Sequence, residues 1–164
     1  MTDPLLQQLL DKQSISEVLL TYTRAIDSQD ENRLRSVFHH DSEHNHTFVG
    51  PSSNSDLAST ATEPGDFVGY ALNALKGYIA THHQLGQPLI TISGHQAQSE
   101  CYFTAIHHVR DITDPLAPAI AQDTIMEYSV GGRYIDVFEK REGLWKILNR
   151  KGVVDWRQLV PLGL

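Results

Sequence analysis

The sequence predicts an α+β fold, with helices in the first half of the chain and long strands in the second. Apolar residues recur at three- and four-residue steps in the first part, which is the period of an amphipathic helix. Later they alternate with polar residues, and turn signals separate the segments. Helices followed by a run of strands are typical of α+β proteins. We expect a cone-shaped, curved, mixed or antiparallel sheet packed on three N-terminal helices and enclosing a pocket.

The first predicted helix runs from Pro4 to about Gln29, after an Asp3-Pro4 start that suits an N-cap and a first helical position. Ser14 and Glu17 have the spacing of a capping box, which suggests that this helix is broken midway. Its apolar positions are Leu5, Leu6, Leu9, Leu10, Ile15, Val18, Leu19, Tyr22 and Ile26.

Two further helices are predicted before the strands begin. A short one carries Leu34, Val37 and Phe38, and a longer one is capped by Asp66. Between them, residues 44–49 predict a short strand, and the polar stretch 51–65 predicts a loop. The apolar positions of the third helix are Phe67, Val68, Ala71, Leu72, Leu75, Tyr78 and Ile79.

The strands of the second half are predicted by alternation and by turns. Arg141-Glu142-Gly143 is a good hairpin turn between the last two strands, and the Gly131-Gly132 pair indicates a bulge. The basic residues near this turn are interpreted as the solvated face of a strand pair; they are Lys140, Arg141, Lys146, Arg150 and Lys151. The predicted strands are 88–92, 96–110, 120–139 and 145–155.

Length and composition restrict the possible classes of protein. The 164 residues suffice for one hydrophobic core, so we expect a single domain over residues 1–164. A formal charge of −7, with 13 Lys and Arg residues, disfavours a nucleic-acid partner. No apolar stretch is long enough to span a bilayer. The single cysteine, Cys101, and a start without a signal-peptide pattern predict a cytoplasmic protein.

Nine histidines raise the question of a metal site. On a strand, His44 and His46 share a face, but a metal site requires three or four ligands in a defined geometry. No spaced set of carboxylates or thiols completes one, so we expect no metal.

Asp27 stands where the first helix is predicted to end. A carboxylate there faces the negative end of the helix dipole, which is unfavourable, so a hydrogen-bonding or cationic histidine is the expected compensation. Turn preferences alone would make Asp27 an ordinary polar turn residue. The neighbouring His82 and His83 point to opposite faces of a strand, so one of them can line a pocket.

The same choice arises for His107 and His108. His107 shares a strand face with the apolar set Cys101, Phe103, Ala105 and Val109. His108 shares the other face with Tyr102, Thr104 and Ile106. We expect the more polar face, with Tyr102 and His108, to form the pocket wall, although an apolar face could equally do so.

Three segments carry a family resemblance: residues 22–27 (Tyr-Thr-Arg-Ala-Ile-Asp), residues 81–83 (Thr-His-His) and residues 131–147. In this order, and over nearly the whole chain, they resemble the SnoaL-like branch of the nuclear transport factor 2 superfamily. This branch includes scytalone dehydratase, a lindane dehydrochlorinase and a bile-acid dehydratase, which are cofactor-free lyases that use an Asp-His pair. The resemblance implies that Asp27 and His83 form this pair.

The resemblance also implies further pocket residues. Tyr22 and His108 fall on positions that support catalysis, and His46 and Arg133 fall on positions that contact the substrate. From the residues alone, Tyr22 could instead pack in the core, and Arg133 could pair with an acid on a neighbouring strand. Two of these depart from scytalone dehydratase, since His46 replaces a tyrosine and Arg133 replaces an asparagine. Scytalone is therefore a poor guess for the substrate.

The expected activity is that of a cofactor-independent lyase on a hydrophobic, aromatic or polycyclic small molecule, either a dehydratase-type elimination or a related carbon-carbon lyase step. Asp27 would orient His83 as the general base, and Tyr22, His46 or His108 would act as the acid. An isomerase or cyclase with the same pocket, or a non-catalytic binding or interaction module, is the alternative, because one fold serves many functions. The resemblance also implies a homodimer or homotrimer.

Overall fold

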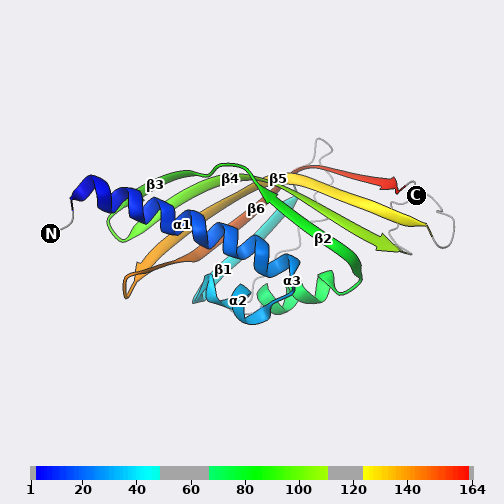
Figure 1. Ribbon diagram of the computed structural model, residues 1–164, viewed down its shortest axis with the longest axis horizontal. Coiled ribbons are helices and arrows are strands. Elements are labelled where there is room, and N and C mark those ends of the chain that lie inside the picture. Colours follow the sequence, from blue (N-terminus) through cyan, green and yellow to red (C-terminus); the bar gives the residue numbers. More distant parts are fainter. Residues whose placement is uncertain (1–2, 49–66, 111–123, 163–164) are drawn as a thin grey trace.

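The computed structural model describes residues 3–48, 67–110 and 124–162, and for residues 45–48 it describes the backbone alone. The predicted α+β class is confirmed: three helices pack on a six-stranded mixed sheet (Figure 1). The predicted loop at 51–65, the Asp66 cap and residues 120–123 lie outside the described residues. The helices are α1 (Pro4–Asp27), α2 (Glu31–Ser36) and α3 (Phe67–Leu75).

The sheet has the strand order β1-β6-β5-β4-β2, and β3 also pairs with β4. All pairs are antiparallel except β1 with β6, which is parallel and makes the sheet mixed. Long pairings of β4 with β5 and of β5 with β6 form its centre. The strands are β1 (Phe38–Phe48), β2 (Tyr78–Leu85), β3 (Leu89–Ser93), β4 (Gln96–Arg110), β5 (Ile125–Arg141) and β6 (Leu144–Pro161).

Helix α1 begins as predicted and does not break. The Asp3 side chain caps it by accepting a hydrogen bond from the backbone of Leu5 at 2.7 Å, and Pro4 follows at the first helical position. The Ser14 hydroxyl donates to the carbonyl oxygen of Leu10 at 2.9 Å. This bond leaves the serine inside a continuous helix, so the predicted break at a capping box is wrong.

Several boundaries differ from the prediction, including β6, which runs to Pro161 and not to residue 155. Phe38 opens β1 instead of closing α2, and Tyr78 and Ile79 belong to β2 instead of the third helix. A short apolar run fits a helix face and a strand equally well, and here the pairing of Tyr78 with Val109 of β4 decides for the strand.

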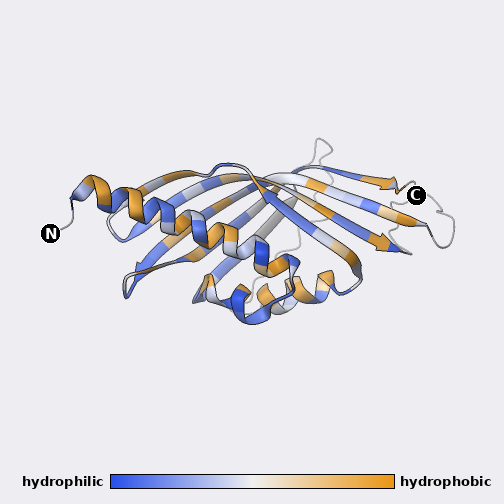
Figure 2. Ribbon diagram, in the orientation of Figure 1, coloured by the Kyte–Doolittle hydropathy of each residue, from blue (hydrophilic) through white to orange (hydrophobic). Residues whose placement is uncertain are grey.

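The hydrophobic core lies between α1 and the face of the sheet that α1 crosses, which we call the inner face (Figure 1). Figure 2 shows hydrophobic and hydrophilic residues interleaved along α1 and the strands, as expected for elements with one buried face. Strand residues in the core include Phe103 and Ala105 of β4, Tyr134 and Phe138 of β5, and Ile147 of β6.

A bulge lies at the glycine pair, but on the partner strand β6 and not on the glycine strand as predicted. Gly131 pairs with Trp156 and Gly132 with Val154, so β6 has one extra residue at this point. A Cβ atom on Gly132 would lie 2.0 Å from the carbonyl oxygen of Val153. Close approach of β6 therefore requires glycine here. At the end of the same hairpin, Glu142 and Gly143 have φ values of 52° and 81°, which confirms the predicted turn.

We expect Gly132→Ala to lower the free energy of unfolding by about 1–3 kcal/mol, because the new methyl group pushes against the backbone of β6. Urea unfolding followed by circular dichroism measures this. Gly77→Ala is the matched control, since no heavy atom lies within 4 Å of its added Cβ. An equal loss in both variants would show that backbone crowding at the bulge is not the cause.

Candidate active site

Asp27 and His83 are in direct contact. His83 Nδ1 lies 2.7 Å from Asp27 Oδ1, and the backbone N–H of His83 donates to Asp27 Oδ2 at 2.9 Å. The Thr81 hydroxyl donates to Asp27 Oδ1 at 3.0 Å. The carboxylate thus accepts three hydrogen bonds from one strand.

The ends of two elements bring these groups together. Asp27 is the last residue of α1, and Thr81 and His83 share one face of β2 because they are two residues apart. The three donors offset the unfavourable position of the carboxylate at the negative end of the helix dipole. Burial raises the pKa of Asp27, but the hydrogen bonds from His83 and Thr81 outweigh burial and lower the pKa overall.

The contact with Asp27 also determines the proton position on His83. Because a carboxylate only accepts, Nδ1 carries the proton of the neutral imidazole, and in this tautomer Nε2 has the lone pair. Nε2 has no hydrogen-bond partner in the part of the chain that the structure describes. The His83 side chain is largely buried, with 8% of its surface exposed. The pair is therefore arranged as a base and the group that orients it.

His107 forms the next part of the site. Its ring stands edge-on to the ring of His83, with centroids 5.4 Å apart, and its Nδ1 lies 3.2 Å from the carbonyl oxygen of Tyr128. Burial and the nearby His83 lower the pKa of His107 to about 4. His107 is therefore neutral at neutral pH and contributes an uncharged wall beside His83.

The predicted choice of His108 is wrong in orientation. Residues 103, 105 and 107 of β4 are buried on the inner face, whereas His108 lies on the opposite, outer face, with Nε2 3.6 Å from a Glu127 carboxylate oxygen. Tyr102 is on the same outer face and is 65% exposed. The helices cover the apolar face of β4, so the apolar set, with His107, faces the dyad.

We expect His107 to make the protein less stable in acid. Its folded-state pKa of about 4 lies below the usual 6.5, so its contribution is complete above pH 6.5 and is lost as the pH falls toward 4. This loss amounts to about 3 kcal/mol of unfolding free energy. Urea unfolding at pH 7 and pH 5 should show a smaller acid loss in His107→Gln than in the parent chain. His108→Gln, on the outer face, should lose as much unfolding free energy in acid as the parent chain. A smaller loss in that control would contradict the assignment of the effect to His107.

Arg133 also lies on the outer face, and the prediction that it contacts a substrate in the pocket is not supported by its position. Its guanidinium lies 3.3 Å from Asp155 and 3.5 Å from Glu100, and its Cα is paired with that of Tyr102. Strand alternation places it away from the Asp27–His83 pair. Arg133 pairs with acids on the two neighbouring strands.

Tyr22 lies in the core, under a buried arginine. The guanidinium carbon of Arg150 is 4.1 Å from the Tyr22 ring centroid and 4.3 Å from that of Tyr134. Arg150 forms two hydrogen bonds of 2.7 and 2.8 Å with Asp136, and both side chains are fully buried. The structure thus places Tyr22 in a cluster with Arg150, not beside the Asp27 carboxylate. The interpretation of Arg150 as part of a solvated face is wrong.

His46 lies on β1, opposite Gly152 of β6, and its side chain is outside the described part. Within residues 3–44, 67–110 and 124–162, no group of three His, Cys, Asp or Glu side chains could hold a metal ion. No helix described is long and apolar enough to cross a membrane.

Comparison with known protein families identifies the chain. The family model described as SnoaL-like domain matches residues 7–151. The chain belongs to the SnoaL-like domain family, within the nuclear transport factor 2-like superfamily. No curated protein matches it significantly.

Solved structures share the SnoaL-like fold at low sequence identity. The Kfla4162 protein from Kribbella flavida is 18% identical, with a TM-score of 0.71 over 92% of this chain and 95% of that one. A proposed scytalone dehydratase from Novosphingobium aromaticivorans is 18% identical, with a TM-score of 0.69 over 92% and 88%. A hexachlorocyclohexane dehydrochlorinase from Novosphingobium barchaimii is 16% identical, with a TM-score of 0.66 over 96% and 94%.

In this SnoaL-like chain, sequence reasoning missed three features of the site. Thr81 was part of the matching motif but had no assigned role, although its hydroxyl binds Asp27. His107 lies beside His83 on the apolar face, although the polar face with His108 was expected to form the pocket wall. Strand alternation gave no sign of the Arg150–Asp136 pair, because β6 contains a bulge. Val137 pairs with Asn149 and Phe138 with Ile147, so Leu148 is an extra residue. This bulge turns Arg150 to the inner face.

Proposed function

We propose that this protein is a cofactor-independent lyase in which His83, oriented by Asp27, is the general base for an elimination. The observation that carries the proposal is the 2.7 Å contact between His83 Nδ1 and an Asp27 carboxylate held by two further donors. This arrangement leaves Nε2 as a base with a fixed direction. Among the structural neighbours, one is described as a proposed scytalone dehydratase and another as a hexachlorocyclohexane dehydrochlorinase; both names denote eliminations, which supports the same reaction class.

In the proposed reaction, Nε2 removes a proton from a carbon next to an electron-withdrawing group. The C–H electron pair forms a carbon-carbon double bond as a hydroxide or halide leaves the neighbouring carbon. A leaving hydroxide takes up the proton from the His83 imidazolium and departs as water. After loss of a halide ion, the imidazolium releases its proton to solvent, so in both cases the enzyme returns to its starting state. This route requires no separate acid from Tyr22 or His108, which the structure places in the core and on the outer face.

The surroundings of the dyad support a hydrophobic, aromatic or polycyclic substrate. The inner-face neighbours along β4 are His107, Ala105 and Phe103, and the Phe103 ring stacks on Tyr134 at 4.3 Å. Aromatic walls with a few directed polar groups are typical of small-molecule sites. The enclosed conical pocket stays a prediction.

The proposed partner besides the substrate is a second copy of the chain, as a homodimer or homotrimer. The first turns of α1 support this part of the proposal, because four leucines there are exposed: Leu5, Leu6, Leu9 and Leu10. Such a concentration of apolar side chains is typical of an interface. Light scattering on the purified protein measures the number of subunits.

An elimination assay tests the function. The protein is incubated in D₂O with γ-hexachlorocyclohexane and with a panel of aromatic β-hydroxy ketones, and products are analysed by mass spectrometry and chloride release. We expect the parent protein to form products that have lost HCl or water, and the His83→Ala variant to form none. Products of unchanged mass apart from deuterium would indicate an isomerase or cyclase. Substrate binding without loss of mass or exchange of carbon-bound hydrogen would indicate a binding module.

A further inference from the structure

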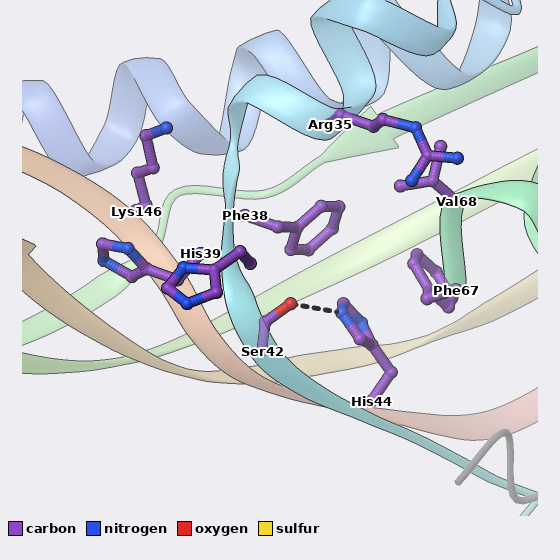
Figure 3. A pocket seen from close by; sticks show the side chains of 9 residues that line it. Arg35, Phe38, His39, Ser42, His44, Phe67, Val68 and Lys146 are labelled. Carbon is purple, nitrogen blue, oxygen red and sulfur yellow. Dashed lines mark hydrogen bonds between the residues drawn. The ribbon is translucent and has the colours of Figure 1, made fainter. Parts of the chain in front are cut away.

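A second site lies at the edge of the sheet, around an irregularity in β1. Phe38 pairs with Ile147 and Glu43 with Asn149, so residues 39–42 have no register partners on β6. This bulge borders a pocket of about 430 Å³, which we call the bulge pocket (Figure 3). Asp27, Thr81, His83 and His107 are not among its lining residues. Its volume is in the range of small-molecule sites.

Contacts with the end of β5 hold the bulge in place. Arg141 donates two hydrogen bonds to the Asp41 carboxylate, at 2.8 and 3.0 Å. His39 Nε2 lies 3.0 Å from the carbonyl oxygen of Glu139. These contacts tie the bulge to the end of β5, so the pocket wall is formed before any ligand binds.

One wall of the bulge pocket is aromatic. The ring of His44 stacks on Phe67, with centroids 4.2 Å apart and an interplanar angle of 2°, and stands edge-on to Phe38 at 4.6 Å. Phe38 and Phe67 are themselves edge-to-face at 5.7 Å. The Ser42 hydroxyl lies 3.0 Å from His44 Nε2 and fixes this ring (Figure 3). Phe38 and Phe67 are 6% and 4% exposed, so these rings offer a ligand a narrow apolar surface at the pocket wall.

The charges around the bulge pocket are positive. Its described lining includes Arg35 and Lys146 and no Asp or Glu, on a chain whose formal charge is −7. Arg35 is already paired with Glu31 at 2.7 Å. Lys146 has no carboxylate within ion-pair distance among the described residues, and Glu139, its cross-strand partner, contacts Arg141 instead. In Figure 3, Phe38 lies between Lys146 on one side and Phe67 on the other.

We propose that the bulge pocket binds a small aromatic carboxylate, with the carboxylate at Lys146 and the ring against Phe38 and Phe67. The lysine ammonium supplies a charge-assisted hydrogen bond, and the rings supply apolar contact area. The ligand neutralises a lysine that the described chain leaves without an acidic partner. The site is independent of the proposed elimination, because it uses none of the residues of the dyad.

Calorimetric titration with 2-naphthoate and its neutral analogue 2-naphthamide tests the proposal. The protein should bind one equivalent of naphthoate at least tenfold more tightly than the amide. Lys146→Gln should weaken naphthoate binding about tenfold and leave amide binding unchanged. Lys151→Gln is the matched control, because it removes the same charge from an exposed position of the same strand that does not line the pocket.

Changes in the amide chemical shifts on adding naphthoate show where it binds on the protein. Naphthoate should perturb the signals of residues 38–44, 67, 68 and 146, and circular dichroism should show that both lysine variants are folded. Equal affinity for acid and amide would overturn the proposal. So would equal weakening in the Lys146 and Lys151 variants, or perturbations centred on Thr81 and His83.

Discussion

Replacing Asp27 by Asn or His83 by Ala is expected to lower the kcat of the proposed elimination by about a hundredfold or more. His83→Ala removes the base itself. Asp27→Asn keeps the size of the side chain. However, its NH₂ group faces a hydrogen-bond donor of Thr81 or His83 that, in the parent protein, binds a carboxylate oxygen. The imidazole then loses its orientation and the negative charge that stabilises its protonated form. Steady-state kinetics with the substrate found by product analysis measure both effects.

The two losses should not add, because the residues act as one unit. The double variant should retain about the activity of His83→Ala alone. His82→Ala is the matched control: the residue is adjacent in sequence, exposed and on the opposite strand face. It should keep nearly full activity. Modest losses that add up, or an equal loss in His82→Ala, would mean that the Asp27–His83 contact is a structural hydrogen bond and not a catalytic one.

The sequence contained enough to place Asp27 but not its partner. Helical periodicity put Asp27 at the end of α1, and the helix dipole indicated that a hydrogen-bond donor must be near. That the donors are Thr81 and His83 depends on how β2 crosses the end of α1, a contact between residues more than 50 positions apart. No local pattern encodes such a contact, and family resemblance supplied it.

Strand alternation separated the two faces of β4 but could not say which face is inner. The polar set with His108 looked more like a pocket wall, whereas the helices cover the apolar set with His107. A site built on a hydrophobic face is common, because a dry environment shifts pKa values more strongly, as His107 shows. Deciding which face of β4 is the inner one requires the position of α1, and strand alternation gives no information about that position.

Arg150 illustrates a different limit. Alternation counted along β6 assumes an unbroken register, and the extra residue Leu148 reverses the faces after Ile147. A single bulge thus converted an expected surface cation into the most deeply buried charge of the described chain. A bulge without glycine has no reliable signal in one sequence, whereas the Gly131-Gly132 pair indicated where the other bulge lies, although not that β6 carries its extra residue.

We expect Asp136→Asn to lower the free energy of unfolding by about 3–5 kcal/mol. Burial alone would lower the pKa of Arg150, but Asp136 raises it above its usual value, so the guanidinium stays charged in the core. Both of its hydrogen bonds to the protein go to Asp136, and its Nη1 has no partner among the described residues. Without the carboxylate, a full charge remains buried between the rings of Tyr22 and Tyr134. Urea unfolding measures the loss.

Asp155→Asn provides the matched control, because it removes the same type of partner from an arginine on the outer face. Arg133 and Asp155 are both about one-third exposed, so their pair should contribute no more than about 1 kcal/mol. Replacing both buried partners, Asp136→Leu with Arg150→Met, should recover most of the loss, because no charge is then left unpaired. If the double variant is as unstable as Asp136→Asn, the packing of the two side chains against Tyr22 and Tyr134 stabilises the core. Their charge pairing would then not be the cause.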